Sequence, residues 1–178
     1  MPHAVAHVLI AIISIELFRE YILKDKKKLP RYYILIAALG GVLPDLDILL
    51  YYILYFFGFS FEQIHRTFLH TLFIPLIFLL IGISFYRIDK NYEIKQWKIN
   101  FAKAFFILSA GIFIHITLDS LSGGIMPFYP LSQIIIGTNI SNLLPELLRP
   151  LFYPLLDGIL LIFWLFWMEF KLKINNYF

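Results

Sequence analysis

The sequence contains no cysteine, and only 15% of its 178 residues are charged. Without thiols the chain forms no disulfide, iron–sulfur cluster or thiolate zinc site, so any metal ion must be held by nitrogen and oxygen atoms. The net charge of +3 gives little reason to expect a nucleic-acid partner. Hydrophobic residues make up 60% of the chain, above the roughly 45–50% of soluble domains. This composition predicts a protein surrounded by lipid.

Five apolar stretches are each long enough to cross a bilayer, which takes about 20 mostly apolar helical residues. They are residues 4–23, 32–57, 68–86, 102–121 and 150–170. Near the end of the first stretch, Glu16, Arg19 and Glu20 are interpreted as an ion cluster at the membrane interface. We see no internal repeat and no second domain. The prediction is an all-α polytopic membrane protein, with about five transmembrane helices forming a helical bundle in a single integral membrane domain, residues 1–178.

Basic residues predict the orientation of this bundle. They gather in the first connection, the third connection and the C-terminal segment: Lys24, Lys26, Lys27, Lys28 and Arg31; Arg87, Lys90, Lys95, Lys98 and Lys103; Lys171 and Lys173. The two remaining connections hold only Arg66 and Arg149. Because basic connections stay on the cytoplasmic side, we expect a multi-pass cell-membrane protein with an extracytoplasmic N-terminus and a cytoplasmic C-terminus.

Seven residues of metal-ligand type fall inside or beside the apolar stretches. They are His7, Asp45, Asp47, His65, His70, His115 and Asp119. Counting 1.5 Å per helical residue from the basic boundaries places those of four stretches about 18–25 Å from the cytoplasmic side. That layer is the outer half of a hydrocarbon core about 30 Å thick. Ionisable groups are costly at this depth and usually mark a functional site. The shared depth therefore predicts a metal centre assembled from several helices.

The spacing within two of the motifs supports convergence on one ion. His115 and Asp119 are four residues apart, so they share a helix face, although such a pair alone could be a simple hydrogen bond. In Gly40-Gly41-Val42-Leu43-Pro44-Asp45-Leu46-Asp47, the glycines and proline interrupt helical geometry. A break lets both aspartates face one cavity, whereas the alternative is a kinked helix with solvated carboxylates.

The segment His65-Arg66-Thr67-Phe68-Leu69-His70-Thr71 adds two histidines and an arginine. We expect His65 in a loop or at a helix start, and His70 in the first turns of the following helix. Arg66 would lie at the mouth of the site and suits a phosphate or carboxylate group; its alternative role is contact with lipid headgroups. Membership of two further residues in the site stays open: His3, which shares a face with His7, and Asp157, which falls in the same layer.

The order and spacing of these motifs resemble a known family. His7, Leu43-Pro44-Asp45-x-Asp47, His65-Arg66-x-x-x-His70-Thr71 and His115-x-x-x-Asp119 are similar to the motifs of the YdjM-like, LexA-binding, inner membrane-associated hydrolases, also called membrane-bound metal-dependent hydrolases. The resemblance covers residues 7 to about 130, and Thr67, Leu69 and Thr71 replace a glycine, a threonine and a serine that are frequent in the family. It implies a metal-dependent hydrolase. A more distant similarity to zinc-dependent phospholipase C proteins favours phosphoester substrates.

Seven ligand candidates exceed the needs of one ion, so the first hypothesis is a dinuclear hydrolase. The metal is expected to be zinc, with manganese or iron as alternatives. All seven residues are candidate ligands; Asp47 could instead bridge, act as a base or orient other ligands, and Arg66 would hold an anionic group. Membrane lipids are the expected partners, and an amphiphilic substrate such as a phospholipid or polyprenyl phosphate fits the depth. The alternatives are an ion or metal transporter or proton relay, and a scaffolding membrane protein.

Overall fold

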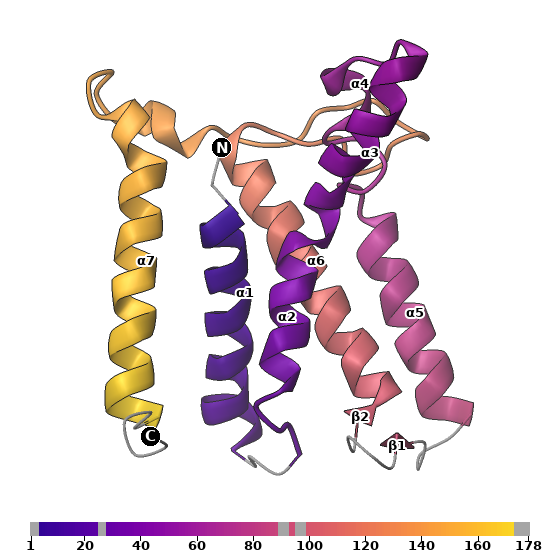
Figure 1. Ribbon diagram of the computed structural model, residues 1–178, viewed down its shortest axis with the longest axis vertical. Coiled ribbons are helices and arrows are strands. Elements are labelled where there is room, and N and C mark those ends of the chain that lie inside the picture. The colour runs from indigo at the N-terminus through magenta and orange to yellow at the C-terminus, as the bar shows by residue number, and fades with distance from the viewer. Residues whose placement is uncertain (1–3, 25–27, 89–92, 95–98, 173–178) are drawn as a thin grey trace.

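The computed structural model describes residues 4–24, 28–88, 93–94 and 99–172, and it is almost entirely helical (Figure 1). The helices are α1 (Ala4–Leu17), α2 (Tyr33–Val42), α3 (Asp47–Leu54), α4 (Phe61–Ile64), α5 (Phe73–Ile88), α6 (Phe101–Ser122) and α7 (Arg149–Leu172). A π-helical segment η1 (Phe18–Leu23) continues α1, and 3-10 turns form η2 (Leu43–Leu46), η3 (Tyr55–Phe57) and η4 (Ile140–Leu143). Strands β1 (Glu93–Ile94) and β2 (Ile99–Asn100) pair as a short antiparallel hairpin. The predicted all-α fold is confirmed.

Each of the five predicted apolar stretches contains a long helix. Among the described residues, three helical runs are long and apolar enough to cross a membrane on their own: Tyr33–Phe57, Phe101–Ser122 and Arg149–Phe170. The apolar helix Phe73–Arg87 is shorter, and α1 with η1 carries the three charged residues noted above. The protein is therefore a helical membrane protein.

The helices stand side by side, and α7 lies at the edge of the bundle (Figure 1). Helix α6 packs against α5 and α2, α2 also packs against α1, and α7 contacts α1. The hairpin, the α1–α2 connection and the end of α7 lie at one end of the bundle, while α4 and the start of α7 lie at the other (Figure 1). We call the first the basic end, because its described residues include Lys24, Lys28, Arg31, Arg87 and Lys103. The segregation of basic residues predicted from the sequence matches this arrangement.

Helix α2 is held between α1 and α6 by glycines that let the backbones approach closely. A Cβ atom added to Gly40 would lie 2.6 Å from the carbonyl oxygen of Leu108 and 2.9 Å from Cα of Gly111. On the other side, a Cβ added to Gly41 would lie 2.7 Å from the carbonyl oxygen of His7. Side chains at these positions would push the helices apart, so small residues are required here as they are at many membrane helix crossings.

We expect Gly41→Ala to lower the thermal stability of the detergent-purified protein, because the added methyl group collides with the backbone of α1. Overpacking of this kind costs about 1–3 kcal/mol. Gly158→Ala on α7 is the matched control, since a Cβ there meets no atom within 4 Å. Both changes bring the same gain in helix propensity, about 1 kcal/mol. Equal melting temperatures for the two variants would contradict the close crossing.

Candidate metal centre

A break in the second membrane-spanning run carries two of the predicted acidic residues. Helix α2 ends at Val42, the four residues of η2 form a 3-10 turn around Pro44, and α3 begins at Asp47. Proline cannot continue the hydrogen-bond ladder of α2 because it lacks an N–H group. As a result both carboxylates approach His70: Asp45 Oδ1 lies 3.6 Å from its Nε2, and Asp47 Oδ2 lies 3.1 Å from its Nδ1. The predicted break is confirmed, and both aspartates contact His70, but from opposite nitrogens of its ring rather than from one cavity.

Turns rather than a helix carry His70. Helix α4 ends at Ile64, His65 is extended, Arg66 has a left-handed backbone with φ of 63°, and α5 begins only at Phe73. Our placement of His70 in the first turns of a helix is therefore wrong. The Asp47 carboxylate accepts a hydrogen bond from the Arg66 N–H (3.1 Å), which removes that donor from any helical ladder.

Four ligand atoms from three segments form the centre of the site. His70 Nε2 and His115 Nε2 lie 3.2 Å apart. Asp119 Oδ2 lies 3.2 Å from the first and 3.7 Å from the second, and Asp45 Oδ1 lies 3.6 and 3.5 Å from the same two nitrogens. Ligand atoms about 2.0–2.1 Å from a tetrahedral zinc ion would be separated by about 3.3 Å. These five spacings are close to that value, so the two histidines together with either carboxylate have the geometry to hold one small cation.

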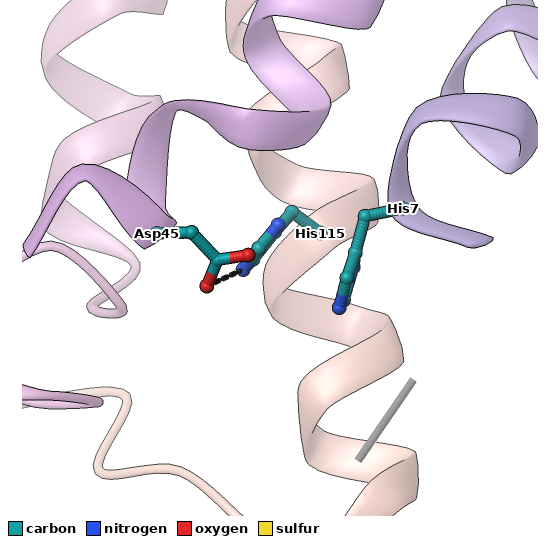
Figure 2. Close-up of side chains that lie close together, drawn as sticks. All are labelled: His7, Asp45 and His115. Carbon is teal, nitrogen blue, oxygen red and sulfur yellow. Dashed lines mark ion pairs between the residues drawn. The ribbon is translucent and has the colours of Figure 1, made fainter. Parts of the chain in front are cut away.

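His7 completes the group from the first helix. Its ring stacks on the ring of His115 with centroids 3.9 Å apart, and its Nε2 lies 3.4 Å from Asp119 Oδ1. Figure 2 shows His7, Asp45 and His115 approaching one another from three different helical segments. Three overlapping sets offer ligand atoms within 4.8 Å of one another: His7, Asp45 and His115; Asp45, His65 and His70; His70, His115 and Asp119. Six of the seven predicted ligands are thus brought together in these sets.

Asp47, the seventh, holds imidazole rings rather than joining one of the sets. Its Oδ1 accepts a hydrogen bond from His65 Nδ1 at 2.9 Å. Its Oδ2 lies 3.1 Å from His70 Nδ1, without the alignment of a formed hydrogen bond. His115 is held in the same way, because its Nδ1 donates to the carbonyl oxygen of Gly41 at 2.7 Å. Contacts at Nδ1 orient histidine ligands and leave Nε2 for a metal ion.

The charges of the site call for a cation. Asp45, Asp47 and Asp119 bring three carboxylates, and Arg66 brings one guanidinium, so with neutral histidines two negative charges are uncompensated. Asp47 and Asp119 are buried, and Asp45 is only partly exposed. Buried charges are costly unless they are paired or coordinate a metal. A divalent cation would offset both charges, and a nitrogen–oxygen donor set suits zinc, manganese or iron.

Arg66 lies beside the centre, at the mouth where the sequence placed it. Its NH2 contacts Asp119 Oδ1 at 3.2 Å and Ser122 Oγ at 3.3 Å, and its NH1 donates to the carbonyl oxygen of Gly124 at 3.4 Å. The sequence reasoning did not identify Ser122 or Gly124 as partners of this residue. The only signal was the turn-forming Ser122-Gly123-Gly124 run that directly follows the ligand motif on α6.

A pocket of about 520 Å³ opens next to His65 and Arg66. Its walls include Phe61, His65, Arg66, Gly123, Met126 and Ile135. The Arg66 side chain is 18% exposed, so part of it remains accessible from this pocket. The pocket combines the Arg66 guanidinium and the Glu62 carboxylate with mostly apolar walls.

The sequence left the membership of two further residues open. His3 lies outside the described residues. Asp157 is half-buried on α7 and belongs to none of the three ligand sets found in the described part of the chain. The predicted cluster on the first helix does form, with Arg19 NH1 lying 3.0 Å from Glu16 Oε1 and 3.1 Å from Glu20 Oε1.

Comparison with known proteins agrees with the motif resemblance. The model of the YdjM inner membrane protein family matches residues 1–173. No curated protein and no solved structure matches the chain. Since the family match spans nearly the whole sequence, this chain belongs to the YdjM inner membrane protein family.

Proposed function

We propose that this protein is a membrane-embedded, metal-dependent hydrolase that acts on a phosphoester or another lipid-like substrate. One observation carries the proposal: two imidazole nitrogens 3.2 Å apart, His70 Nε2 and His115 Nε2, each lie within 3.7 Å of the Asp45 and Asp119 carboxylates. Such a set of deprotonated donors, buried in a chain without cysteine, is the kind that catalytic zinc sites use.

His70, His115, Asp45 and Asp119 would hold the first metal ion. His7 and His65 belong to the overlapping ligand sets, so they extend the centre to a second ion in a dinuclear arrangement. Zinc is the first candidate, and manganese or iron also suit these ligands. A divalent ion supplies Lewis acidity, which makes water a nucleophile at neutral pH and stabilises the negative charge of the transition state.

Asp47 acts in this proposal as a positioning residue. One of its oxygens accepts from His65 Nδ1, and the other accepts from the backbone N–H of Arg66 and faces His70 Nδ1. Both oxygens are therefore engaged on the side away from the centre. This arrangement favours orientation of the two rings over the bridging or general-base roles that the sequence left open.

The pocket beside the centre indicates the kind of substrate. Arg66 offers a guanidinium to an anionic group, while Phe61, Met126 and Ile135 offer apolar walls to a hydrocarbon portion. The pocket lies at the end of the bundle opposite the basic end, which corresponds to the extracytoplasmic leaflet when basic connections face the cytoplasm. A phospholipid or a polyprenyl phosphate in that leaflet has the required chemistry.

The transporter hypothesis is disfavoured by the packing between the centre and the basic end. The buried cluster there consists of Ile15, Leu29, Tyr33, Ala37 and Ile107. An ion pathway would need polar groups or water along this route. Glu16 and Arg19 lie near this cluster but pair with each other at 3.0 Å, so the packing favours a centre that is open toward one side, as a hydrolase requires.

We expect the purified protein to contain a stoichiometric divalent metal, which elemental analysis will identify. The double variant His70→Ala, Asp119→Ala removes two of the four central ligands and is expected to lose the metal. Asp157→Ala is the matched control, because it removes a membrane-embedded carboxylate that lies in none of the ligand sets. Metal-free wild-type protein, or full metal content in the double variant, would refute the proposed centre.

Hydrolysis itself is tested by incubating the metal-loaded protein with a panel of lipids and measuring released phosphate or fatty acid. We expect product from at least one phosphoester lipid and none from the metal-free double variant. Arg66→Gln should lower kcat/KM by roughly 10–100-fold, because a hydrogen bond to a charged group contributes about 1.5–3 kcal/mol. Activity that is equal in the wild type and the double variant would point to a contaminant.

The orientation can be tested because the chain has no cysteine, so single cysteines can be labelled without background. Leu147 is 85% exposed just before α7, and Lys24 is exposed at the basic end. In intact cells a membrane-impermeant maleimide should label Leu147→Cys and leave Lys24→Cys unlabelled until the membrane is permeabilised. The reverse pattern would place the pocket in the cytoplasmic leaflet.

A further inference from the structure

A second cavity lies at the basic end, far from the metal centre. It is a groove of about 790 Å³ whose residues come from α1 with η1, the segment before α2, α5 and α6. Its apolar walls include Ile15, Phe18, Leu23, Phe106, Ile107 and Ala110. None of the histidines or aspartates of the metal centre lines this groove.

Two lysines and one tyrosine supply the polar side chains of the groove. Lys28 and Lys103 are both exposed and both line it, and Tyr86 is 56% exposed beside them. No acidic residue is among the described residues that line the groove. Lys103 lies in the first turn of α6 and Lys28 precedes α2, so both cations belong to the basic end of the bundle. The groove therefore has a cationic end and an apolar remainder.

The groove runs along the axis of α6, as the acyl chain of a bilayer lipid would. From Lys103 to Ala110 the groove follows seven residues of α6, which is about 10 Å along the helix axis. It thus descends from the level of the headgroups into the hydrocarbon layer. Lysine side chains at helix ends reach toward headgroups, where each adds attraction for an anionic lipid.

We propose that this groove binds an anionic phospholipid of the leaflet at the basic end. The lipid phosphate lies between Lys28 and Lys103, and one acyl chain lies against Ile107 and Ala110. An anionic headgroup is favoured because a zwitterionic one brings its own cation to a groove that already has two ammonium groups. The site is separate from the proposed hydrolase centre and does not depend on that activity.

The test uses the full-length protein in detergent and native mass spectrometry to compare phosphatidylglycerol with phosphatidylcholine of identical acyl chains. We expect selective binding of phosphatidylglycerol. The double variant Lys28→Gln, Lys103→Gln should bind it about thirtyfold more weakly, the combined effect of two basic residues. The double variant Lys24→Gln, Arg87→Gln removes the same charge from the same end without touching the groove, and it should retain its affinity to within about threefold.

A second variant tests the contribution of the acyl chain to binding separately from that of the headgroup. Ala110→Leu fills the groove without changing any charge, so it should weaken binding of the long-chain lipid. Four outcomes would overturn the proposal: equal binding of the two lipids, equal losses in the two double variants, unchanged binding in Ala110→Leu, or competition by inorganic phosphate alone as effective as that by the lipid. The last outcome would identify a free phosphate site instead.

Discussion

The close contact of α2 with α1 and α6 is the constraint on which the candidate metal centre depends. Gly41 lies against the backbone of His7, and its own carbonyl oxygen accepts the hydrogen bond from His115 Nδ1. One residue thus sets the spacing between two helices and the orientation of a ring carried by a third. The chain then breaks at Pro44, which turns Asp45 toward the same rings. Without the glycine contact the stacked pair of His7 and His115, both of which also contact Asp119, would separate.

Burial explains why the centre holds together as a unit. His70 and His115 are fully inaccessible and Asp119 is 3% exposed, so the water that normally solvates such groups is excluded. Each group must then be satisfied by its neighbours or by an ion. With neutral histidines the four central ligand atoms are all electron-pair donors, and each lies within 3.7 Å of at least one other. The remaining negative charge makes the arrangement favourable for a cation rather than for protein contacts alone. In this respect the centre differs from the Arg19 cluster, where a guanidinium supplies the cation and also donates to the Leu29 carbonyl.

Hydropathy and ligand chemistry were enough to predict the helical bundle, the break at Pro44 and the convergence of six histidine and aspartate ligands, because lipid burial penalises polar groups that lack a function. The start of the third helix could not be predicted in this way. Residues 65–72 contain no proline or glycine that would stop a helix, but the Asp47 carboxylate binds the Arg66 N–H, and Thr67 Oγ1 donates to the Ile64 carbonyl oxygen at 2.6 Å. These contacts join distant or turn-forming groups that no local pattern indicates. The orienting position of Asp47 was hidden for the same reason, since the spacing between Asp45 and Asp47 requires a break but does not say which carboxylate faces the Nε2 atoms and which faces the Nδ1 atoms.

Helix α7 is connected to the candidate metal centre by hydrogen bonds, although it supplies no ligand to it. This helix is at the edge of the bundle and contributes no member of the three ligand sets. However, Tyr153 Oη donates to the Ser122 carbonyl oxygen at 3.4 Å, Ser122 Oγ contacts Arg66 NH2, and the same nitrogen contacts Asp119. A continuous series of polar contacts thus connects α7 to the carboxylate between His7 and His70. The family match extends through α7 to residue 173, beyond the last ligand at Asp119. Because Arg66 is also the cationic group of the pocket, the position of α7 affects both the pocket and the centre.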